Sequence, residues 1–279
     1  MIGVIGLGLI GGSLAKALNQ NTDYSVYGYD IDSSVLSKAK LVGAIEDELK
    51  EEMLCECDIV IVALYPSDTV DYVRSNAEKF KKGSLVIDCC GVKNPVCSIL
   101  EPLAQKHGFI FIGGHPMAGL EHSGFEYSKK ALFDKASMVL VPPAGINIKD
   151  LEKIKSLCTS IGFSNIQIST ADEHDRMIAF TSQLAHVTSN AYIKSSTASH
   201  HAGFSAGSYY DMTRVAKLNE KMWTELFLEN PAYLSCEIQE LIDHLGEYKN
   251  AIDSKDRDKL AALLKDGREK KEKIDKEFF

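Results

Sequence analysis

The sequence predicts an α/β fold, in which a doubly wound parallel sheet is followed by an all-α C-terminal domain. Three observations lead to this prediction. Short β-branched apolar runs alternate with stretches of helical spacing over the first 170 residues, a glycine-rich segment follows the first run, and strand-like runs stop after Ile168. We therefore expect two domains, the first over residues 1–170 and the second over residues 171–279.

The apolar runs are typical of strands that are buried on both faces, because their residues do not alternate with polar ones. The predicted strands are Ile2–Ile5, Ser25–Tyr29, Ile59–Leu64, Leu85–Asp88, Phe109–Ile112, Met138–Val141 and Ile166–Ile168. The predicted helices between them include Ser13–Leu18, Ser33–Leu41, Thr69–Phe80 and Pro95–Lys106. Strands that alternate with helices form βαβ units, so the strand ends should meet at one edge of the sheet.

The second domain should be entirely helical. Thr170 and Glu173 have the spacing of a capping box, and the sequence from there to about Lys194 predicts one long helix without proline or glycine. Further helices are predicted at Met212–Asn219, Lys221–Leu228, Ala232–Lys249 and Asp256–Lys276.

Charge, cysteine content and hydropathy exclude several classes of protein. A net charge of -8 argues against binding to nucleic acid, which requires a basic face. The seven cysteines follow neither a disulfide framework nor the paired spacing of a zinc site, so we expect free thiols, no metal and a cytoplasmic location. The uncharged stretch before Lys16 lacks the basic start of a secretory signal, and no other run approaches the ~20 apolar residues of a membrane span.

A GxGxxG segment runs from Gly6 to Gly11, directly after the first predicted strand and at the start of a helix. In this context the first glycine makes a tight turn, the second lets the backbone approach a pyrophosphate, and the third allows close helix packing. The second strand ends nineteen residues later at Asp30, whose carboxylate can accept hydrogen bonds from ribose hydroxyls. The cofactor-binding residues predicted here are Gly6, Gly8, Leu9, Ile10, Gly11 and Asp30.

The predicted cofactor is NAD rather than NADP. Asp30 is followed by no Arg or Lys before Lys38, so nothing close by would neutralise a 2′-phosphate. The alternative interpretation is that the glycines only turn a tight strand–helix corner.

The same edge of the sheet holds the segments that follow the later strands. Leu64 and Pro66 are therefore further candidates for cofactor binding. His115 lies among glycines after the fifth predicted strand, near the expected nicotinamide, and histidine has the pKa to take a hydroxyl proton as a carbon gives up hydride. We predict His115 as the catalytic residue, the alternative being a loop histidine that caps the backbone.

In the second domain, Gln183, His186 and Asn190 share one polar stripe of the first long helix. Most such stripes are polar core or solvent-facing surface. Arg214 lies at the predicted start of a helix, just beyond a glycine-containing segment. Its guanidinium is either a surface charge or a planar fork for a substrate carboxylate.

Four segments of the chain together carry a family resemblance. They are Gly6-Leu-Gly-Leu-Ile-Gly-Gly-Ser13, Gly113-Gly-His-Pro-Met-Ala-Gly119, Ser182-Gln-Leu-Ala-His186, and Asp211-Met-Thr-Arg-Val-Ala216 followed by Met222-Trp223. With these segments the chain resembles the prephenate dehydrogenase family over nearly its whole length.

The resemblance implies an N-terminal Rossmann-type domain and a helical substrate-binding and dimerisation domain, with a homodimer as the assembly. It also implies an enzyme of tyrosine biosynthesis that converts prephenate to 4-hydroxyphenylpyruvate by oxidative decarboxylation with NAD⁺. By the same resemblance, His115 polarises the ring hydroxyl, Arg214 holds the ring carboxylate, and His186 supports the other end of the substrate.

The chain departs from the family pattern at two positions. Many members carry Gly-Ser-Val-Lys where this chain has Cys90-Gly91-Val92-Lys93, so the serine that orients the catalytic histidine has no counterpart at Gly91. A common Ser-His-Leu-Pro-His motif has Gln183 in place of its first histidine.

Three alternatives stay open at this point. The substrate could be arogenate in place of prephenate, and Glu121, beside the histidine segment, is our candidate for the residue that distinguishes the two. A β-hydroxyacid dehydrogenase would need a lysine on the first interdomain helix, which here has only Lys194 at its far end. A non-catalytic NAD-sensing module would need no acid–base group, so His115 and Arg214 argue against it.

Overall fold

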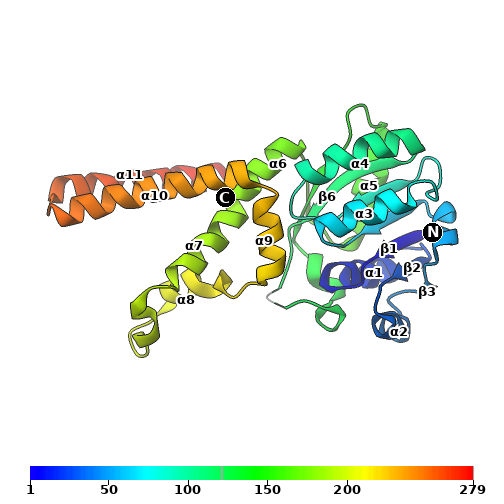
Figure 1. The fold of residues 1–279 in the computed structure, drawn as a ribbon, viewed down its shortest axis with the longest axis horizontal. Helices are drawn as coiled ribbons and strands as arrows, with labels where there is room; N and C mark the ends of the chain where they lie inside the picture. Colours follow the sequence, from blue (N-terminus) through cyan, green and yellow to red (C-terminus); the bar gives the residue numbers. More distant parts are fainter. Residues whose placement is uncertain (121, 279) are drawn as a thin grey trace. The chain divides into compact units, whose positions relative to one another are not determined.

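A computed structural model describes residues 1–120 and 122–278 of the chain (Figure 1). Backbone contacts group the chain into two compact units, Met1–Asn230 and Pro231–Phe279. The first unit holds a sheet and the helices as far as α9, and the second holds α10 and α11. The domain boundary expected at residue 170 stays a prediction.

Eight strands of the described residues form one sheet in the order β3-β2-β1-β4-β5-β6-β7-β8. They are β1 (Ile2–Ile5), β2 (Val26–Tyr29), β3 (Asp47–Glu48), β4 (Ile59–Val62), β5 (Leu85–Asp88), β6 (Ile110–Pro116), β7 (Ser137–Val141) and β8 (Asn165–Ile168). Every neighbouring pair is parallel except β6 and β7. The strand order reverses between β1 and β4, where open α/β sheets bind their ligands. The predicted doubly wound α/β fold is confirmed.

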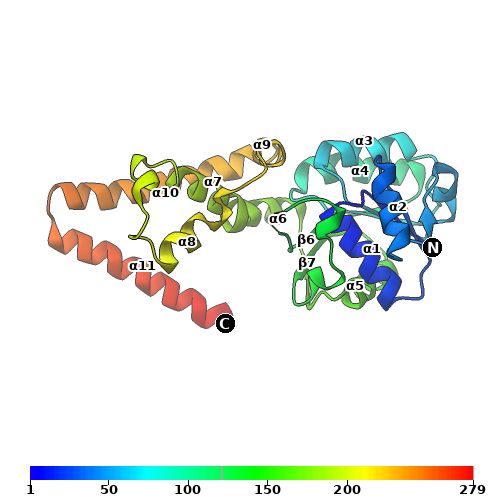
Figure 2. The same ribbon diagram turned by 90° about the horizontal axis from the view of Figure 1, so that it is seen from below.

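Helices cover both faces of the sheet (Figure 2). Each face has its own hydrophobic core. They are α1 (Leu9–Asn21), α2 (Ser33–Leu41), α3 (Pro66–Asn76), α4 (Asn94–His107) and α5 (Ile148–Ile161), with the 3₁₀ turns η1 (Glu51–Glu56), η2 (Phe125–Tyr127) and η3 (Lys130–Phe133). Along β4, Ile59 and Ile61 pack in the core of α1 and α5, whereas Val60 and Val62 pack in the core of α3 and α4. Both faces of the strand are buried, which explains its continuous apolar run.

Two strands differ from the sequence-based prediction. β3 contains only Asp47 and Glu48, at the edge of the sheet, and no apolar pattern marks it. β6 continues beyond its predicted end as far as Pro116, and its last residues pair antiparallel with β7, with His115 opposite Val139. His115 is therefore held in a strand and does not belong to a loop.

Gly113 and Gly114 allow β6 to continue because a larger residue would collide with its neighbours. A β-carbon at Gly114 would lie 2.4 Å from the carbonyl oxygen of Asp88, and one at Gly113 would lie 3.0 Å from Cδ of Lys93. The two glycines thus let the side chain of Lys93 and the end of β5 approach the strand that carries His115.

Asp88 and Lys93 form an ion pair whose two side chains are both 0% exposed. The Lys93 ammonium also donates a hydrogen bond to the carbonyl of Gly114 (2.6 Å), and the Asp88 carboxylate accepts from the N–H groups of Gly114 (3.0 Å) and Cys90 (2.8 Å). Burial lowers the pKa of Lys93, but the charge of Asp88 and its hydrogen bond outweigh this effect, so the pKa is raised overall. The pair ties the end of β5 to β6.

The helix predicted after Thr170 is present, with one turn of π-helix within it. Its parts are α6 (Ala171–Ile178), the π-helical η4 (Ala179–Gln183) and α7 (Leu184–Tyr192), and the unit continues through η5 (Ser196–His200), α8 (Gly207–Thr213), η6 (Arg214–Ala216) and α9 (Glu220–Leu228). Thr170 caps the helix by accepting a hydrogen bond from the Glu173 N–H (3.2 Å), as the predicted capping box requires. π-Helical turns occur frequently at functional sites.

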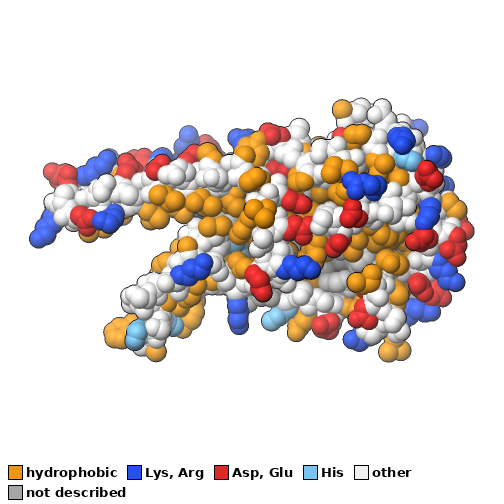
Figure 3. Space-filling model, in the orientation of Figure 1, with side chains coloured by type: hydrophobic (Ala, Val, Ile, Leu, Met, Phe, Trp, Pro, Cys, Tyr) orange, Lys and Arg blue, Asp and Glu red, His pale blue; other side chains and the backbone are white. Residues whose placement is uncertain are grey.

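The second compact unit is a pair of packed helices, α10 (Pro231–Asp253) and α11 (Arg257–Phe278). α10 exposes Ile242, Leu245 and Ile252, each more than half accessible, and Figure 3 shows hydrophobic side chains gathered along this helix. In the part of the chain that the structure describes, no helix combines the length and apolar character needed to cross a bilayer.

The buried ion pair leads to a stability prediction. Lys93→Met should lower the free energy of unfolding by about 3–5 kcal/mol, because it leaves the Asp88 carboxylate buried without a counter-charge. Urea unfolding followed by circular dichroism measures this change. Lys40→Met is the matched control, since the pair that Lys40 makes with Asp47 is exposed, and it should leave the unfolding curve nearly unchanged. Equal effects of the two substitutions would contradict a special role for the buried pair.

Candidate functional site

The turn between β1 and α1 can be built only with glycine at two positions. Gly6 has a φ of +81°, and a β-carbon there would lie 2.7 Å from both the Ala63 carbonyl oxygen and Cδ2 of Leu64. A β-carbon at Gly11 would lie 1.8 Å from the carbonyl oxygen of Gly6. The close packing that the GxGxxG motif predicts is therefore present, and it places Leu64 against the motif.

The first turn of α1 is open to an anion. Gly8 is the N-cap residue, no side chain caps the helix, and a β-carbon at Gly8 would meet nothing within 4 Å. Leu9 and Ile10 form the first turn, and both are only partly buried. The partial positive charge of a helix N-terminus and free space in front of Gly8 fit the pyrophosphate of a dinucleotide.

Asp30 lies beside this turn, at the end of β2. One carboxylate oxygen accepts a hydrogen bond from the Leu7 N–H (2.8 Å), and the other accepts from the Asp32 N–H (3.0 Å). These bonds hold the partly exposed carboxylate against the glycine motif and leave it further lone pairs. The arrangement fits the ribose of a dinucleotide.

Pro66 begins α3 and is buried, at the same strand edge as Leu64. The next residue, Ser67, donates hydrogen bonds from its backbone N–H (2.9 Å) and its hydroxyl (2.5 Å) to the Glu225 carboxylate. The hydrogen bonds between Ser67 and Glu225 therefore hold α9 against the first turn of α3, beside the predicted cofactor residues.

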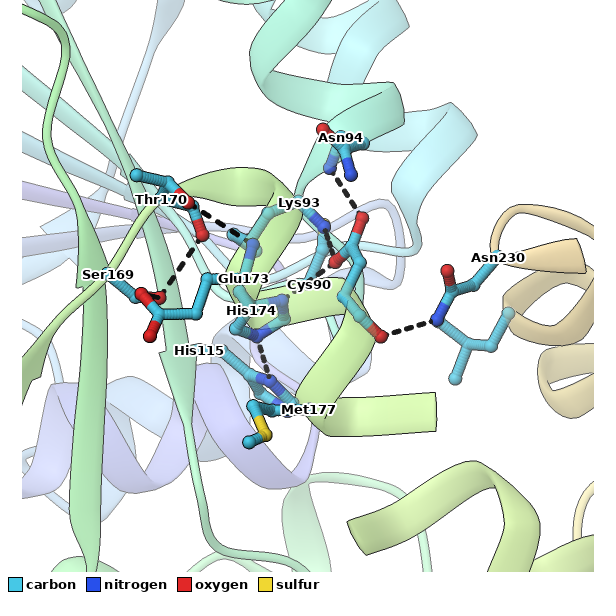
Figure 4. A network of polar contacts seen from close by, with 12 residues as sticks. Cys90, Lys93, Asn94, His115, Ser169, Thr170, Glu173, His174, Met177 and Asn230 are labelled. Carbon is cyan, nitrogen blue, oxygen red and sulfur yellow. Dashed lines mark hydrogen bonds and ion pairs between the residues drawn. The ribbon is translucent and has the colours of Figure 1, made fainter. Parts of the chain in front are cut away.

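His115 belongs to a chain of hydrogen-bonded side chains (Figure 4). Its Nδ1 lies 2.8 Å from Nε2 of His174, and Nδ1 of His174 lies 2.7 Å from Oδ1 of Asp175. The Asp175 carboxylate also accepts hydrogen bonds from the backbone N–H groups of Lys93 and Asn94, both at 2.7 Å. The start of α6 thus connects the turn after β5 to the histidine of β6.

These contacts determine where the protons are in the neutral pair of histidines. A carboxylate can only accept, so Nδ1 of His174 carries the proton and Nε2 of His174 is an acceptor. Nδ1 of His115 must then donate to His174, which leaves Nε2 of His115 unprotonated. Nε2 of His115 is therefore available to accept a proton from a ligand.

The surroundings keep both histidines neutral. Burial lowers the pKa of His115 well below its usual value, and the neighbouring His174 and Lys93 lower it further. The pKa of His174 is also lowered, chiefly by burial, although its hydrogen bond to Asp175 acts in the opposite direction. A neutral His115 at neutral pH is the form that can act as a base.

The space in front of Nε2 of His115 is bounded by Gly91 and Leu226. A β-carbon at Gly91 would lie 3.9 Å from this nitrogen and 3.4 Å from Cδ2 of Leu226, and the backbone of Gly91 does not have a positive φ. The neighbouring Cys90 thiol points elsewhere, toward the Leu64 carbonyl and the Thr69 hydroxyl. His174 thus supplies the contact to the His115 ring.

Sequence reasoning did not select His174 or Asp175. The signal was present as a histidine next to an aspartate in the first turn of a capped helix, but nothing in the sequence places that turn beside His115. The capping-box spacing identifies only Thr170 and Glu173.

His186, one of the two predicted substrate residues of the helical segment, contacts α9. The His186 ring stacks on Trp223 with ring centroids 3.8 Å apart, and its Nδ1 donates to the Ser182 carbonyl (2.9 Å). Burial lowers the pKa of His186, and the charge of Arg214 lowers it further. Arg214 is exposed, and no carboxylate of the described residues pairs with it.

α9 connects these residues to His115. Trp223 and Leu226 are three positions apart and share a face of the helix, so one contacts His186 while the other bounds the space beside His115. Gln183 holds the helix in place by donating to the Leu226 carbonyl (3.0 Å) and accepting from Asn230 (2.9 Å). Gln183 therefore has a packing role, because both its amide nitrogen and its amide oxygen bond to other parts of the protein.

Asn190 and Glu121 are the other two residues that the sequence analysis selected. Asn190, on the same stripe as His186, donates to the Ala216 carbonyl (3.3 Å) and fastens η6 to α7. Glu121 lies outside the described residues.

No group of three or more His, Cys, Asp or Glu side chains that could hold a metal ion occurs among the described residues.

Two family models match the chain. "Prephenate dehydrogenase, nucleotide-binding domain" matches residues 14–166, and "Prephenate dehydrogenase, dimerization domain" matches residues 170–266. Together they cover most of the sheet-containing part and most of the helical part of the chain.

Individual relatives agree with the family models. A cyclohexadienyl dehydrogenase of Zymomonas mobilis is 29% identical over 276 residues, which is 95% of this chain and 92% of the relative. The structure of the Aquifex aeolicus prephenate dehydrogenase in complex with hydroxyphenyl propionate and NAD⁺ superposes with a TM-score of 0.81 at 27% identity, over 98% of this chain and 97% of that one. The Synechocystis arogenate dehydrogenase superposes with a TM-score of 0.82 at 25% identity, over 98% and 99% of the two chains.

The open space at Gly8 yields a test of the dinucleotide site. Gly8→Ala should leave the fold intact, because its β-carbon meets no protein atom, but should weaken NAD⁺ binding about 10-fold or more by separating the backbone from the pyrophosphate. Isothermal titration calorimetry measures the Kd. Gly246→Ala, also in open space but in the middle of α10, serves as the control and should bind NAD⁺ as the parent does. An unchanged Kd for Gly8→Ala would remove the glycine motif from the cofactor site.

Proposed function

This chain belongs to the prephenate dehydrogenase family of NAD-dependent oxidoreductases, and we propose that it converts prephenate to 4-hydroxyphenylpyruvate with NAD⁺ in tyrosine biosynthesis. The observation that carries the proposal is the hydrogen bond from Nδ1 of His115 to His174, which leaves Nε2 of His115 unprotonated in the last part of β6. A ring hydroxyl needs such an acceptor when its carbon loses hydride.

The cofactor is held by the residues that follow the first three strands of the βαβ pattern. Gly6, Gly8, Leu9, Ile10 and Gly11 place the helix N-terminus against the pyrophosphate, Asp30 binds the adenine ribose, and Leu64 and Pro66 complete the site. When bound, the nicotinamide supplies the acceptor for the hydride.

His115 accepts the proton of the substrate hydroxyl at Nε2. Loss of carbon dioxide leaves a phenolate oxygen on the aromatic product, and this oxygen takes the proton back. His115 thus ends each turnover in its starting state, and the reaction requires no net release of protons from the site.

Arg214 binds the ring carboxylate, and His186 supports the other end of the substrate. Arg214 suits this role because its exposed guanidinium has no protein carboxylate among the described residues to compete for it. His186 is fixed by its stacking on Trp223 and by its bond to the Ser182 carbonyl, and no hydrogen bond to its Nε2 occurs among the described residues. We retain Glu121 as the candidate that distinguishes prephenate from arogenate.

Arogenate is the second candidate substrate, because the similar Synechocystis enzyme is an arogenate dehydrogenase. It differs from prephenate in carrying an alanyl group in place of the pyruvyl side chain. The chemistry at His115 and Arg214 is the same for both. A β-hydroxyacid substrate is less well supported, because Lys194 lies beyond α7, away from the start of the interdomain helix.

For the assembly, we propose a homodimer formed by the helical domain over residues 171–279, in which residues 1–170 bind NAD. The "dimerization domain" match over residues 170–266 and the exposed apolar side chains of α10 support this. A native mass of one chain, 30.7 kDa, in light scattering would contradict it. The seven free cysteines support a cytoplasmic location.

The substrate proposal is tested by comparing kcat/KM for prephenate and arogenate, followed as NADH formation. Preference for prephenate supports the proposal, preference for arogenate replaces it with the second candidate, and turnover of neither rejects both.

Arg214→Gln should raise KM for the preferred substrate and leave KM for NAD⁺ unchanged. Lys217→Gln, an exposed cation three residues further on, is the control and should affect neither constant.

The role of His115 is tested by His115→Asn. NAD⁺ binding should be retained while kcat falls by about 10²-fold or more, because a positioned acid–base group contributes that much. Steady-state kinetics measure kcat, and calorimetry measures NAD⁺ binding. We take about threefold as the smallest difference in kcat that the comparison resolves. A kcat within that range of the parent value would show that His115 is not the catalytic base.

A further inference from the structure

We propose that His174 and Asp175 are positioning residues that act through His115, and that His174 holds the substrate's proton while the ring is oxidised and decarboxylated. This inference rests on the proposed function. It assigns a mechanistic role to a pair of residues outside the sequence motifs of the predicted site.

The first step of the argument is the orientation of the His115 ring. Its Nδ1 contacts Nε2 of His174 at 2.8 Å, and the two rings meet edge to face with centroids 5.1 Å apart. No side chain at position 91 can hold the ring from the other side, because that residue is Gly91. Holding the ring through Nδ1 leaves the substrate side of Nε2 free.

The second step is that His174 and Asp175 are held rigidly in place. Asp175 accepts two backbone hydrogen bonds at the start of α4 in addition to the bond from His174. The carbonyl of Asp175 accepts a fourth bond, from the Asn230 amide at 2.8 Å. His174 and Asp175 are 3% and 1% exposed, so neither can turn away into solvent.

The third step is the path of the proton. The O–H bond of the substrate breaks, and its proton binds to Nε2 of His115. The proton on Nδ1 of His115 then passes to Nε2 of His174, which becomes an imidazolium bonded to the Asp175 carboxylate. When the phenolate forms, both transfers reverse and the proton returns to the product oxygen, so no proton is gained or lost by the protein.

The charges around the pair explain why the proton rests on His174. Lys93, at the start of α4, disfavours a positive charge on either histidine. Asp175 on α6 and Asp88 at the end of β5 favour it on His174, whereas no carboxylate is among the groups that act on His115. Glu229, just after α9, has its own pKa raised to about 7 by burial and by the charges of Glu225 and Asp175. The thiols of Cys89 and Cys90 stay neutral because burial raises the pKa of both.

The direction of the pH effect follows from this arrangement. The base is active only when the pair is neutral, so kcat/KM falls as the pH drops through the apparent pKa of the pair. Asp175 raises that pKa by favouring the protonated form. Removing its charge should therefore move the acid limb of the kcat/KM profile to lower pH.

The kinetic experiment compares Asp175→Asn and His174→Gln with Glu173→Gln. Asp175→Asn should lower kcat about 10-fold or more and move the acid limb to lower pH, and His174→Gln should lower kcat with little change in KM. Glu173→Gln removes the same charge from an exposed neighbour and should change neither kcat nor the profile. A folded Asp175→Asn variant whose acid limb does not move would overturn the proposal, because a purely structural role would lower activity without shifting the limb.

A second measurement keeps the proposal testable if Asp175→Asn does not fold, and it requires no substrate. Nitrogen chemical shifts of ¹⁵N-histidine-labelled parent protein, assigned with His174→Gln, report which ring nitrogens carry protons. We expect Nδ1 of His174 and Nδ1 of His115 to be protonated and both Nε2 atoms to be unprotonated at neutral pH. A proton on Nε2 of His174 in place of Nδ1 would overturn the proposal. If instead the expected tautomers are present but the parent enzyme turns over neither prephenate nor arogenate, the proposed function fails and not the arrangement of the histidines.

Discussion

The buried ion pair between Asp88 and Lys93 is the interaction on which the site depends. Two opposite charges removed from water are stable only when further hydrogen bonds satisfy them, and here those bonds come from the backbone of Gly114 and Cys90. The pair therefore joins the end of β5, the turn before α4 and the last part of β6. His115 is the residue directly after Gly114, so the position of its backbone is a consequence of this pair.

The turn between β5 and α4 also connects the sheet to the helical segment. The backbone N–H groups of Lys93 and Asn94 bind the Asp175 carboxylate, and Asp175 in turn binds His174. Lys93, whose charge is buried in the sheet, thus also helps to hold Asp175 and His174 beside His115, the predicted catalytic residue. Lys93 has an electrostatic effect as well, because its charge contributes to keeping His115 neutral.

α9 supplies the opposite wall of the site. Glu225 caps the first turn of α3, Leu226 faces the space beside Nε2 of His115, and Trp223 stacks on His186. Gln183, in the π-helical turn, holds this helix by its backbone. One short helix therefore contacts the first turn of α3 and the predicted substrate residue His186, and its Leu226 borders the space beside the predicted base.

The sequence by itself determined the α/β class, most strand positions, the glycine motif with Asp30, and the presence of a histidine at the carboxyl edge of the sheet. These features are local, since they follow from the periodicity of apolar residues and from the backbone freedom of glycine at Gly6. Only the tertiary structure decided that β6 continues through His115, that Gln183 is a packing residue, and that His174 contacts His115. Each of these depends on residues far apart in the chain, 59 positions in the last case, and no local pattern records which side chains a fold brings within hydrogen-bonding distance.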